Sequence, residues 1–154
     1  MSICFFIGHR DAPEALLKAL EAAVERRIVQ CGVTEFLIGS HGAFDHLAAR
    51  AVRSAKQRHP DIRMTLLLAY YDPKKPDLPL GFDGSLIPLA FERVPRRAAI
   101  VRANRQALAL CAHLIAYDAG QVGNTHKLMA LARRREAAGL LRIENLGEGF
   151  HRPP

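Results

Sequence analysis

Three glycine-containing loops carry the polar residues that could do chemistry in this chain. Each loop follows a short apolar run and leads into a helical pattern; they read Gly8-His9-Arg10, Gly39-Ser40-His41-Gly42 and Gly120-Gln121-Val122-Gly123-Asn124-Thr125. Glycine lets the backbone approach a ligand closely, and the free N–H groups at a helix N-terminus attract anions. Taken singly, each loop could be an ordinary turn or cap. Together they predict a site for a phosphate-containing ligand.

Charged and amide side chains near these loops extend the predicted site. Arg10 could pair with a phosphate, and Asp45 could hydrogen-bond a ribose or a water, although Asp45 could equally make only a helix-dipole contact. Arg102 and Asn104 could close over the ligand or face solvent. The predicted ligand-binding residues are Gly8, His9, Arg10, Gly39, Ser40, Gly42, Asp45, Arg102, Asn104, Asp118, Gly123, Asn124 and Thr125.

The elements that must position these loops alternate between apolar runs and helical patterns. The predicted strands are Ser2–Ile7, Glu35–Ile38, Arg63–Leu68, Leu114–Tyr117 and Leu141–Ile143. A capping box of Asp11 and Glu14, with Pro13 in the first turn, predicts a helix that Gly32 ends. Further helices are predicted over about 44–58, 98–111 and 125–138, the last closed by Gly139.

Continuous apolar strands separated by helices are typical of a parallel sheet covered on both faces. We therefore predict an α/β fold, a Rossmann-like, doubly wound and mostly parallel five-stranded sheet with helices on both faces. The predicted strand order is third, second, first, fourth, fifth. Ligands of such sheets bind at the carboxyl ends of the strands, where the order reverses, so the three loops should converge there.

The segment from about residue 71 to 95 differs from its surroundings because it is rich in proline and glycine. Long loops inside a domain are often lids or binding loops, and a tethered, disordered insertion is the equal alternative. The sequence LIPLAF within it could form a small extra strand. Residues 1–154 otherwise read as one domain.

The composition supports some partners and excludes others. The formal net charge of +7 favours anionic partners, and no apolar run reaches the roughly 18–20 residues of a membrane span. Cys4, Cys31 and Cys111 have neither the pairing nor the spacing of a disulfide framework or a zinc ribbon, so reduced thiols are expected. The expected location is the cytoplasm.

The chain resembles the YpsA-like branch of the SLOG superfamily, which also holds the DprA and LOG proteins. The sequences CFFIGHR, FLIGSHGAFDHLA, VRANRQAL and LIAYDAGQVGNTHKLMALA carry this resemblance, in the same order and over nearly the whole chain. It implies a Rossmann-like fold that binds a nucleotide or a derivative such as NAD or ADP-ribose, as a sensor or ligand-binding domain. It is also compatible with a homodimer.

The resemblance assigns roles by position. The matching residues are Gly8, His9 and Arg10 in the first motif, Gly39, Gly42, Phe44 and Asp45 in the second, Asn104 in an Arg-Asn pair, and Gly123, Asn124 and Thr125 in the phosphate turn. Leu128 stands where LOG-type phosphoribohydrolases carry a glutamate. This departure argues against a LOG-type hydrolase.

Three other functions compete with ligand binding. A nucleotide-processing hydrolase would need an acid, base or nucleophile, and Asp45, His9 and Asp118 are the candidates. Single-stranded nucleic-acid binding of the DprA type could use basic runs, but no aromatic platform for stacked bases is evident. The runs are Arg133, Arg134 and Arg135, and Arg96, Arg97 and Arg102. A metal site at His41 and His46 is disfavoured by their i, i+5 spacing.

Overall fold

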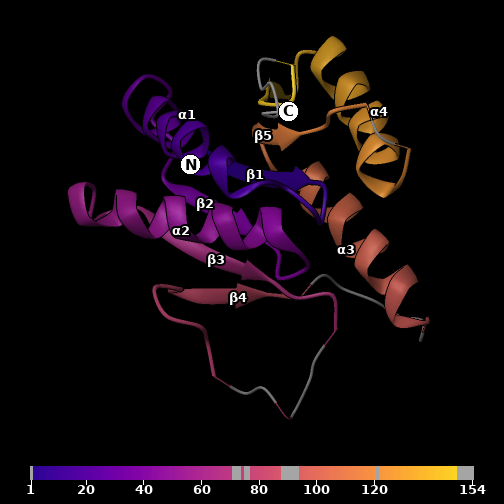
Figure 1. The fold of residues 1–154 in the computed structure, drawn as a ribbon, viewed down its shortest axis with the longest axis horizontal. Coiled ribbons are helices and arrows are strands. Elements are labelled where there is room, and N and C mark those ends of the chain that lie inside the picture. The colour runs from indigo at the N-terminus through magenta and orange to yellow at the C-terminus, as the bar shows by residue number, and fades with distance from the viewer. Residues whose placement is uncertain (1, 71–73, 75–76, 88–93, 121, 149–154) are drawn as a thin grey trace.

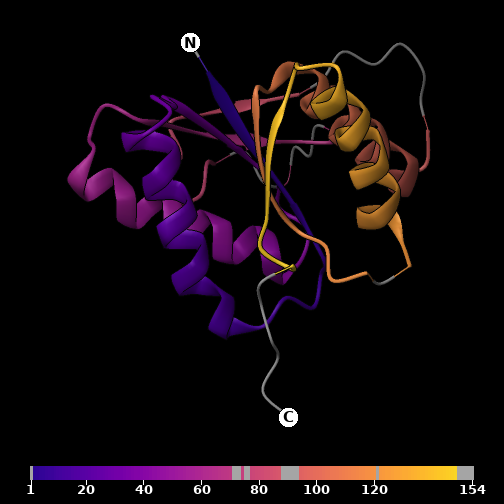
Figure 2. The same ribbon diagram turned by 90° about the horizontal axis from the view of Figure 1, so that it is seen from above.

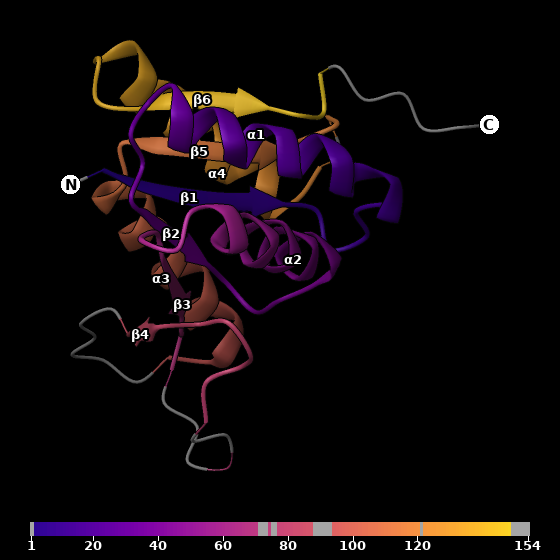
Figure 3. The same cartoon turned by 90° about the vertical axis from the view of Figure 1, so that its left-hand side faces the viewer.

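The centre of the computed structural model is a six-stranded sheet in which every neighbouring pair of strands is parallel (Figure 1). The structure describes residues 2–70, 74, 77–87, 94–120 and 122–148. The strands are β1 (Ile3–Gly8), β2 (Glu35–Ile38), β3 (Arg63–Leu67), β4 (Gly84–Leu86), β5 (His113–Tyr117) and β6 (Arg142–Asn145). Their order is β4-β3-β2-β1-β5-β6, which Figure 3 shows from bottom to top.

Helices cover both faces of the sheet (Figure 2). They are the 3-10 turn η1 (Glu14–Leu16), α1 (Leu17–Val29), α2 (Ala43–Arg58), α3 (Arg96–Leu110) and α4 (Asn124–Ala137). One core lies under α1 and α2, where Phe6, Phe36 and Met64 are buried. The other lies under α3 and α4 and contains Phe5, Leu37 and Leu114. Neighbouring strand residues point to opposite faces, so uninterrupted apolar strands supply both cores.

The predicted α/β class and the order of the five predicted strands are confirmed, but the sheet has a sixth strand. β4 pairs with β3 at the edge of the sheet and overlaps the predicted extra strand LIPLAF only at Leu86. Asp83 fixes the start of this strand, because its carboxylate accepts hydrogen bonds from the Met64 N–H (2.8 Å) and the Lys56 ammonium (2.7 Å). A short edge strand of this kind depends on its neighbour, and its own three residues carry little signal.

The predicted capping box of Asp11 and Glu14 is wrong. Pro13 precedes the 3-10 turn in an extended conformation, no side chain caps that turn, and α1 begins only at Leu17. Glu14 instead forms an ion pair with Arg50 of α2. The prediction that Gly32 ends the first helix is confirmed, because Gly32 adopts a left-handed φ of 68° and donates its N–H to the Ile28 carbonyl.

Two other helix starts differ from the sequence prediction. α3 begins at Arg96, directly after Pro95, which is compatible with an N-terminal boundary but not with a helix interior. α4 begins at Asn124 with Gly123 as its N-cap, so Thr125 lies inside the helix and is not its cap. Gly139 has a left-handed φ of 76° just beyond α4, as expected.

Much of the proline-rich segment lies outside the described residues, namely 71–73, 75–76 and 88–93. The lid therefore stays a prediction. Cys4, Cys31 and Cys111 are all free thiols. In the described part of the chain, no helix combines the length and apolar character that crossing a membrane requires.

Candidate ligand-binding cleft

A cleft of about 420 Å³ lies at the carboxyl ends of β1, β2 and β5. This is where the strand order reverses, because β1 pairs with β2 on one side and β5 on the other. The predicted residues that line it are Gly8, His9, Arg10, Gly39, Asp45, Asn104, Gly123, Asn124 and Thr125. The topology therefore brings the three glycine loops together, as the sequence predicts.

The wall formed by the loop between β5 and α4 is open. Gly123 is the N-cap of α4, has a φ of 155°, and no side chain caps the first turn. A Cβ built at Gly123 would meet no atom within 4 Å. The first N–H groups of a helix have no partner inside the helix. Here Asn124 and Thr125 bring that first turn into the wall of the cleft.

The opposite wall, after β1 and β2, is tightly packed. A Cβ at Gly8 would collide with the Phe44 ring, and one at Gly39 would lie 2.7 Å from the Asp45 carboxylate. Phe44 cannot give way easily, because its ring is buried between Phe6 and Tyr117. These glycines make room for neighbouring side chains and do not face open space.

The Asp45 carboxyl is the titratable group that the cleft perturbs most clearly. Burial raises its pKa to about 6 from the ordinary 3.8, while the His41 N–H (2.9 Å) and the positive charge of Arg10 act in the opposite direction. The effect of burial on the pKa is the larger one, because removing a carboxylate from water costs more free energy than one hydrogen bond contributes. A carboxyl that titrates near neutrality can accept a hydrogen bond from a sugar hydroxyl or donate one to an oxyanion.

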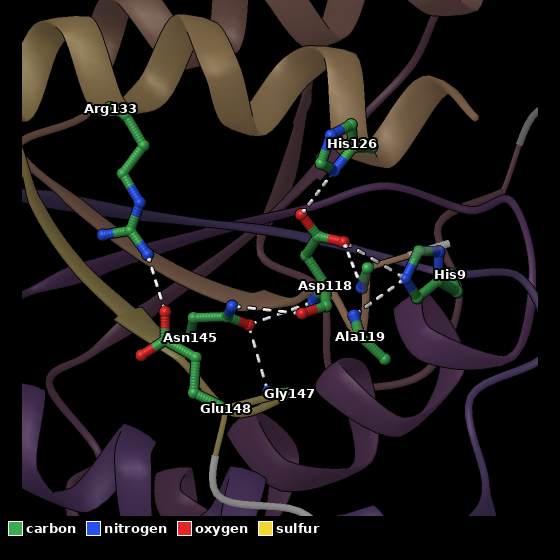
Figure 4. Close-up of polar contacts among 9 residues, drawn as sticks. His9, Asp118, Ala119, His126, Arg133, Asn145, Gly147 and Glu148 are labelled. Atoms are coloured by element: carbon green, nitrogen blue, oxygen red, sulfur yellow. Dashed lines mark hydrogen bonds and ion pairs between the residues drawn. The ribbon is translucent and has the colours of Figure 1, made fainter. Parts of the chain in front are cut away.

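His9 joins the β1 loop to the β5 loop (Figure 4). Its Nε2 accepts a hydrogen bond from the Ala119 N–H at 3.1 Å and lies 3.5 Å from the Asp118 carboxylate, while the ring packs edge-on against Tyr117. His9 is only 8% exposed. Its contacts give it a structural role in the wall of the cleft.

Asp118 holds the β5 loop in place and does not line the cleft. Its carboxylate accepts the Gly120 N–H at 3.0 Å. The same carboxylate lies 3.2 Å from Nδ1 of His126 (Figure 4). Asn145 at the end of β6 pairs with the Asp118 backbone, accepting its N–H at 3.0 Å and donating to its carbonyl at 3.1 Å. Asn145 also accepts the N–H of Gly147.

Three more predicted residues lie outside the lining of the cleft. Gly42, at a left-handed φ of 108°, lets α2 start against the β1 loop, where the Ala43 N–H donates to the Arg10 carbonyl at 2.8 Å. Ser40 is exposed. Arg102 lines a neighbouring cavity of about 640 Å³ along α3, which meets the cleft at Asn124.

Sequence reasoning missed several residues of the site. His41 and Asp11 line the cleft beside predicted neighbours, so their positions in the loops were the available signal. His126 directly follows the predicted residue Thr125, whereas Asn145 had no such signal, because it reaches Asp118 only through the pairing of β5 with β6. Among the described residues, no group of three or more His, Cys, Asp or Glu side chains could hold a metal ion.

No protein-family model and no curated protein matches this chain. Among solved structures it is similar to the DNA processing protein A (DprA) of Streptococcus pneumoniae, with a TM-score of 0.64 and 13% identity over 98% of this chain and 63% of that one. It is also similar to the DprA of Helicobacter pylori, described for its binding of single-stranded DNA, with a TM-score of 0.59 and 13% identity over 97% of this chain and 78% of that one. The chain thus spans less than two thirds of the S. pneumoniae chain. At this identity the likeness shows a shared Rossmann-like fold.

Proposed function

We propose that the cleft binds a nucleotide or a nucleotide derivative through its phosphate, as the ligand-binding domain of a YpsA-like member of the SLOG superfamily. The observation that best supports this proposal is the conformation and surroundings of Gly123. It leaves the uncapped first turn of α4 open to the cleft, and nothing lies within 4 Å of the place where a side chain would stand. Such a helix start is suited to a phosphate.

The acidic residues of the cleft favour a phosphorylated sugar over a bare anion. Arg10 is accompanied by Asp11 and Asp45, so the lining does not present uniform positive charge. Carboxylates beside a phosphate site are useful when the ligand also carries hydroxyl groups, as a ribose does. The half-buried Asp45, with its raised pKa, is the residue best placed for such a hydroxyl.

Calorimetric titration with AMP, ADP-ribose, NAD and inorganic phosphate tests the proposal. At least one nucleotide should bind the wild-type chain, and Gly123→Val should abolish binding because its branched side chain fills the phosphate position. Gly139→Val is the matched control, since Gly139 is also left-handed with nothing within 4 Å of a Cβ but lies beyond α4, away from the cleft. Circular dichroism checks that both variants fold. Equal binding by both variants would refute the proposed phosphate position.

A second candidate function is single-stranded nucleic-acid binding, favoured by the arginines of α3. The helix sequence RRAAIVRANRQALAL contains no acidic residue, and Arg97, Arg102 and Arg105 line the cavity that adjoins the cleft. The run on α4 is less suitable, because Arg133 is paired with Glu136 and Glu148.

Fluorescence anisotropy with a labelled oligothymidylate separates the two candidates. If the α3 surface contacts phosphates, Arg97→Gln and Arg105→Gln should each weaken binding and reduce the slope of log affinity against log salt by about one. Arg133→Gln is the control on α4. If no oligonucleotide binding is detected at low salt, nucleic-acid binding is excluded and nucleotide binding is the proposal that remains.

A further inference from the structure

At the amino-terminal edge of the sheet, opposite the cleft, the Cys31 thiol lies between two guanidinium groups. Cys31 follows α1 and is half-buried. Nη1 of Arg27, on α1, donates to its sulfur at 3.7 Å, and Nη1 of Arg142, at the start of β6, donates at 3.8 Å. A sulfur held by two cationic donors from separate elements is an unusual environment for an ordinary thiol.

Positive charge exceeds negative charge around this sulfur. Glu144 is shared by Arg26 (2.6 Å) and Arg27 (3.5 Å), whereas no carboxylate of the described residues lies within ion-pair distance of Arg142. An exposed guanidinium whose hydrogen-bond acceptor is a thiol has room for a stronger, anionic acceptor.

A buried histidine beside the arginines adds a second sign of an incomplete site. His113 pairs with Arg142 in the β5–β6 ladder and is 6% exposed, and its Nδ1 has no hydrogen-bond partner in the described part of the chain. Burial lowers its pKa, and the charges of Arg27 and Arg142 lower it further, so His113 is neutral at neutral pH. The buried Nε of Arg27 likewise has no partner among the described residues.

The other two thiols of the chain differ from Cys31 in access to solvent. Cys4 and Cys111 are 0% and 3% exposed. Burial raises the pKa of Cys4 far above its usual range and that of Cys111 to about 12, so both remain protonated. A cysteine can react with a disulfide only if its sulfur is reachable from solvent. Cys31 alone among the three combines access with adjacent cations.

We propose that Cys31 is a modification site that forms a mixed disulfide with small anionic disulfides. In this step the Cys31 thiolate attacks one sulfur of the disulfide and forms a new S–S bond. The old S–S bond breaks, and the second sulfur leaves as a thiolate with the electron pair. Arg142 steers the anionic reagent and then pairs with a carboxylate of the attached half. This role is separate from the cleft and does not depend on the proposed function.

Competition between two disulfides of opposite charge tests the proposal. The full chain is treated with glutathione disulfide, which is anionic, or cystamine, which is cationic, and intact mass spectrometry with peptide mapping follows the adducts. We expect one adduct, on Cys31. For each disulfide we compare the rate at which its adduct forms. The rate with glutathione disulfide divided by the rate with cystamine should be about tenfold higher in the folded chain than in the urea-unfolded chain, and this ratio should fall as salt is added.

Arginine variants identify the source of the charge preference. Arg142→Gln should remove most of the preference, and Arg142→Lys should retain it. Arg134→Gln, at an exposed position of α4, should leave the preference unchanged although it loses the same charge. Circular dichroism confirms folding. The proposal is overturned if Cys31 stays unmodified, if its charge preference equals that of the unfolded chain, or if Cys4 and Cys111 react in the folded protein at the same rate.

Discussion

The two walls of the cleft use glycine for opposite reasons. On the β1 and β2 side, Gly8 and Gly39 are crowded by Phe44 and Asp45, so a Cβ at either position would overlap the protein itself. On the β5 side, Gly123 has a φ of 155° and nothing within 4 Å of a Cβ. The first wall uses glycine to bring chain segments together, and the second leaves space beside a helix start. In the sequence, the two kinds of glycine loop look alike.

The largest expected effect is on the crowded wall. Gly8→Ala should destabilise the protein by about 2–3 kcal/mol, because the added methyl group overpacks a ring that Phe6 and Tyr117 already hold in place. Urea unfolding measures the change. A loss below about 0.5 kcal/mol would mean that Phe44 has room to move, and the distinction between the walls would fail.

Arg10 tests whether the crowded wall also contributes to binding. Arg10→Ala should weaken binding of the nucleotide found by calorimetry by about 1.5–3 kcal/mol, the range for a hydrogen bond to a charged group. The fold should survive, since it is the Arg10 backbone carbonyl that holds Ala43. Arg50→Ala serves as the control, because it removes an arginine of α2 that is paired with Glu14 of η1. Unchanged affinity in Arg10→Ala would remove this wall from the phosphate site.

Asp45 should show the cost of keeping a carboxyl in the cleft. Its pKa is raised in the folded state, so its contribution to stability is greatest below about pH 4 and is lost as the pH rises through about 6. Asp45→Asn keeps an oxygen acceptor for the His41 N–H without the charge. The variant should therefore be more stable than the wild type by about 3 kcal/mol at pH 8 and equal to it near pH 3.5, because a shift of one pKa unit corresponds to about 1.4 kcal/mol. Thermal unfolding across this range measures the difference, and a constant difference would contradict the raised pKa.

The smallest effect is expected from comparing two open glycines. Gly123→Ala and Gly139→Ala should each cost about 1 kcal/mol of stability from backbone strain alone, because neither methyl group meets another atom. Their unfolding free energies should fall within about 0.5 kcal/mol of each other. A markedly larger loss at Gly123 would show that the open wall is packed after all.

The sheet could be predicted because its signal is local. The apolar runs of β1, β2, β3, β5 and β6 are long enough to stand out, and helical segments between them require parallel crossovers. The bounds of β4 could not be predicted, because its three residues lie in a proline-rich stretch and pair with the free edge of β3, where Asp83 anchors them.

The position of the cleft followed from the topology, but the roles of its residues did not. The sequence predicts that His9 and Asp118 bind ligand, and only the structure shows that their side chains also contact Ala119, Gly120 and His126. Asn145, which completes this network, lies 27 residues from Asp118 in the chain. A polar residue at a loop is easy to recognise in a sequence, whereas its direction depends on which strand packs beside it.

The sequence by itself determined the alternation of strands and helices, the edge of the sheet where the glycine loops meet, and the excess of basic residues. These properties depend on local patterns and on the handedness of parallel crossovers. The tertiary structure alone decided which glycines face open space, why Asp45 titrates near neutrality, and that Arg142 reaches a thiol 111 residues away. Each of these depends on the register and packing of segments that are distant in the chain, so no local pattern encodes them.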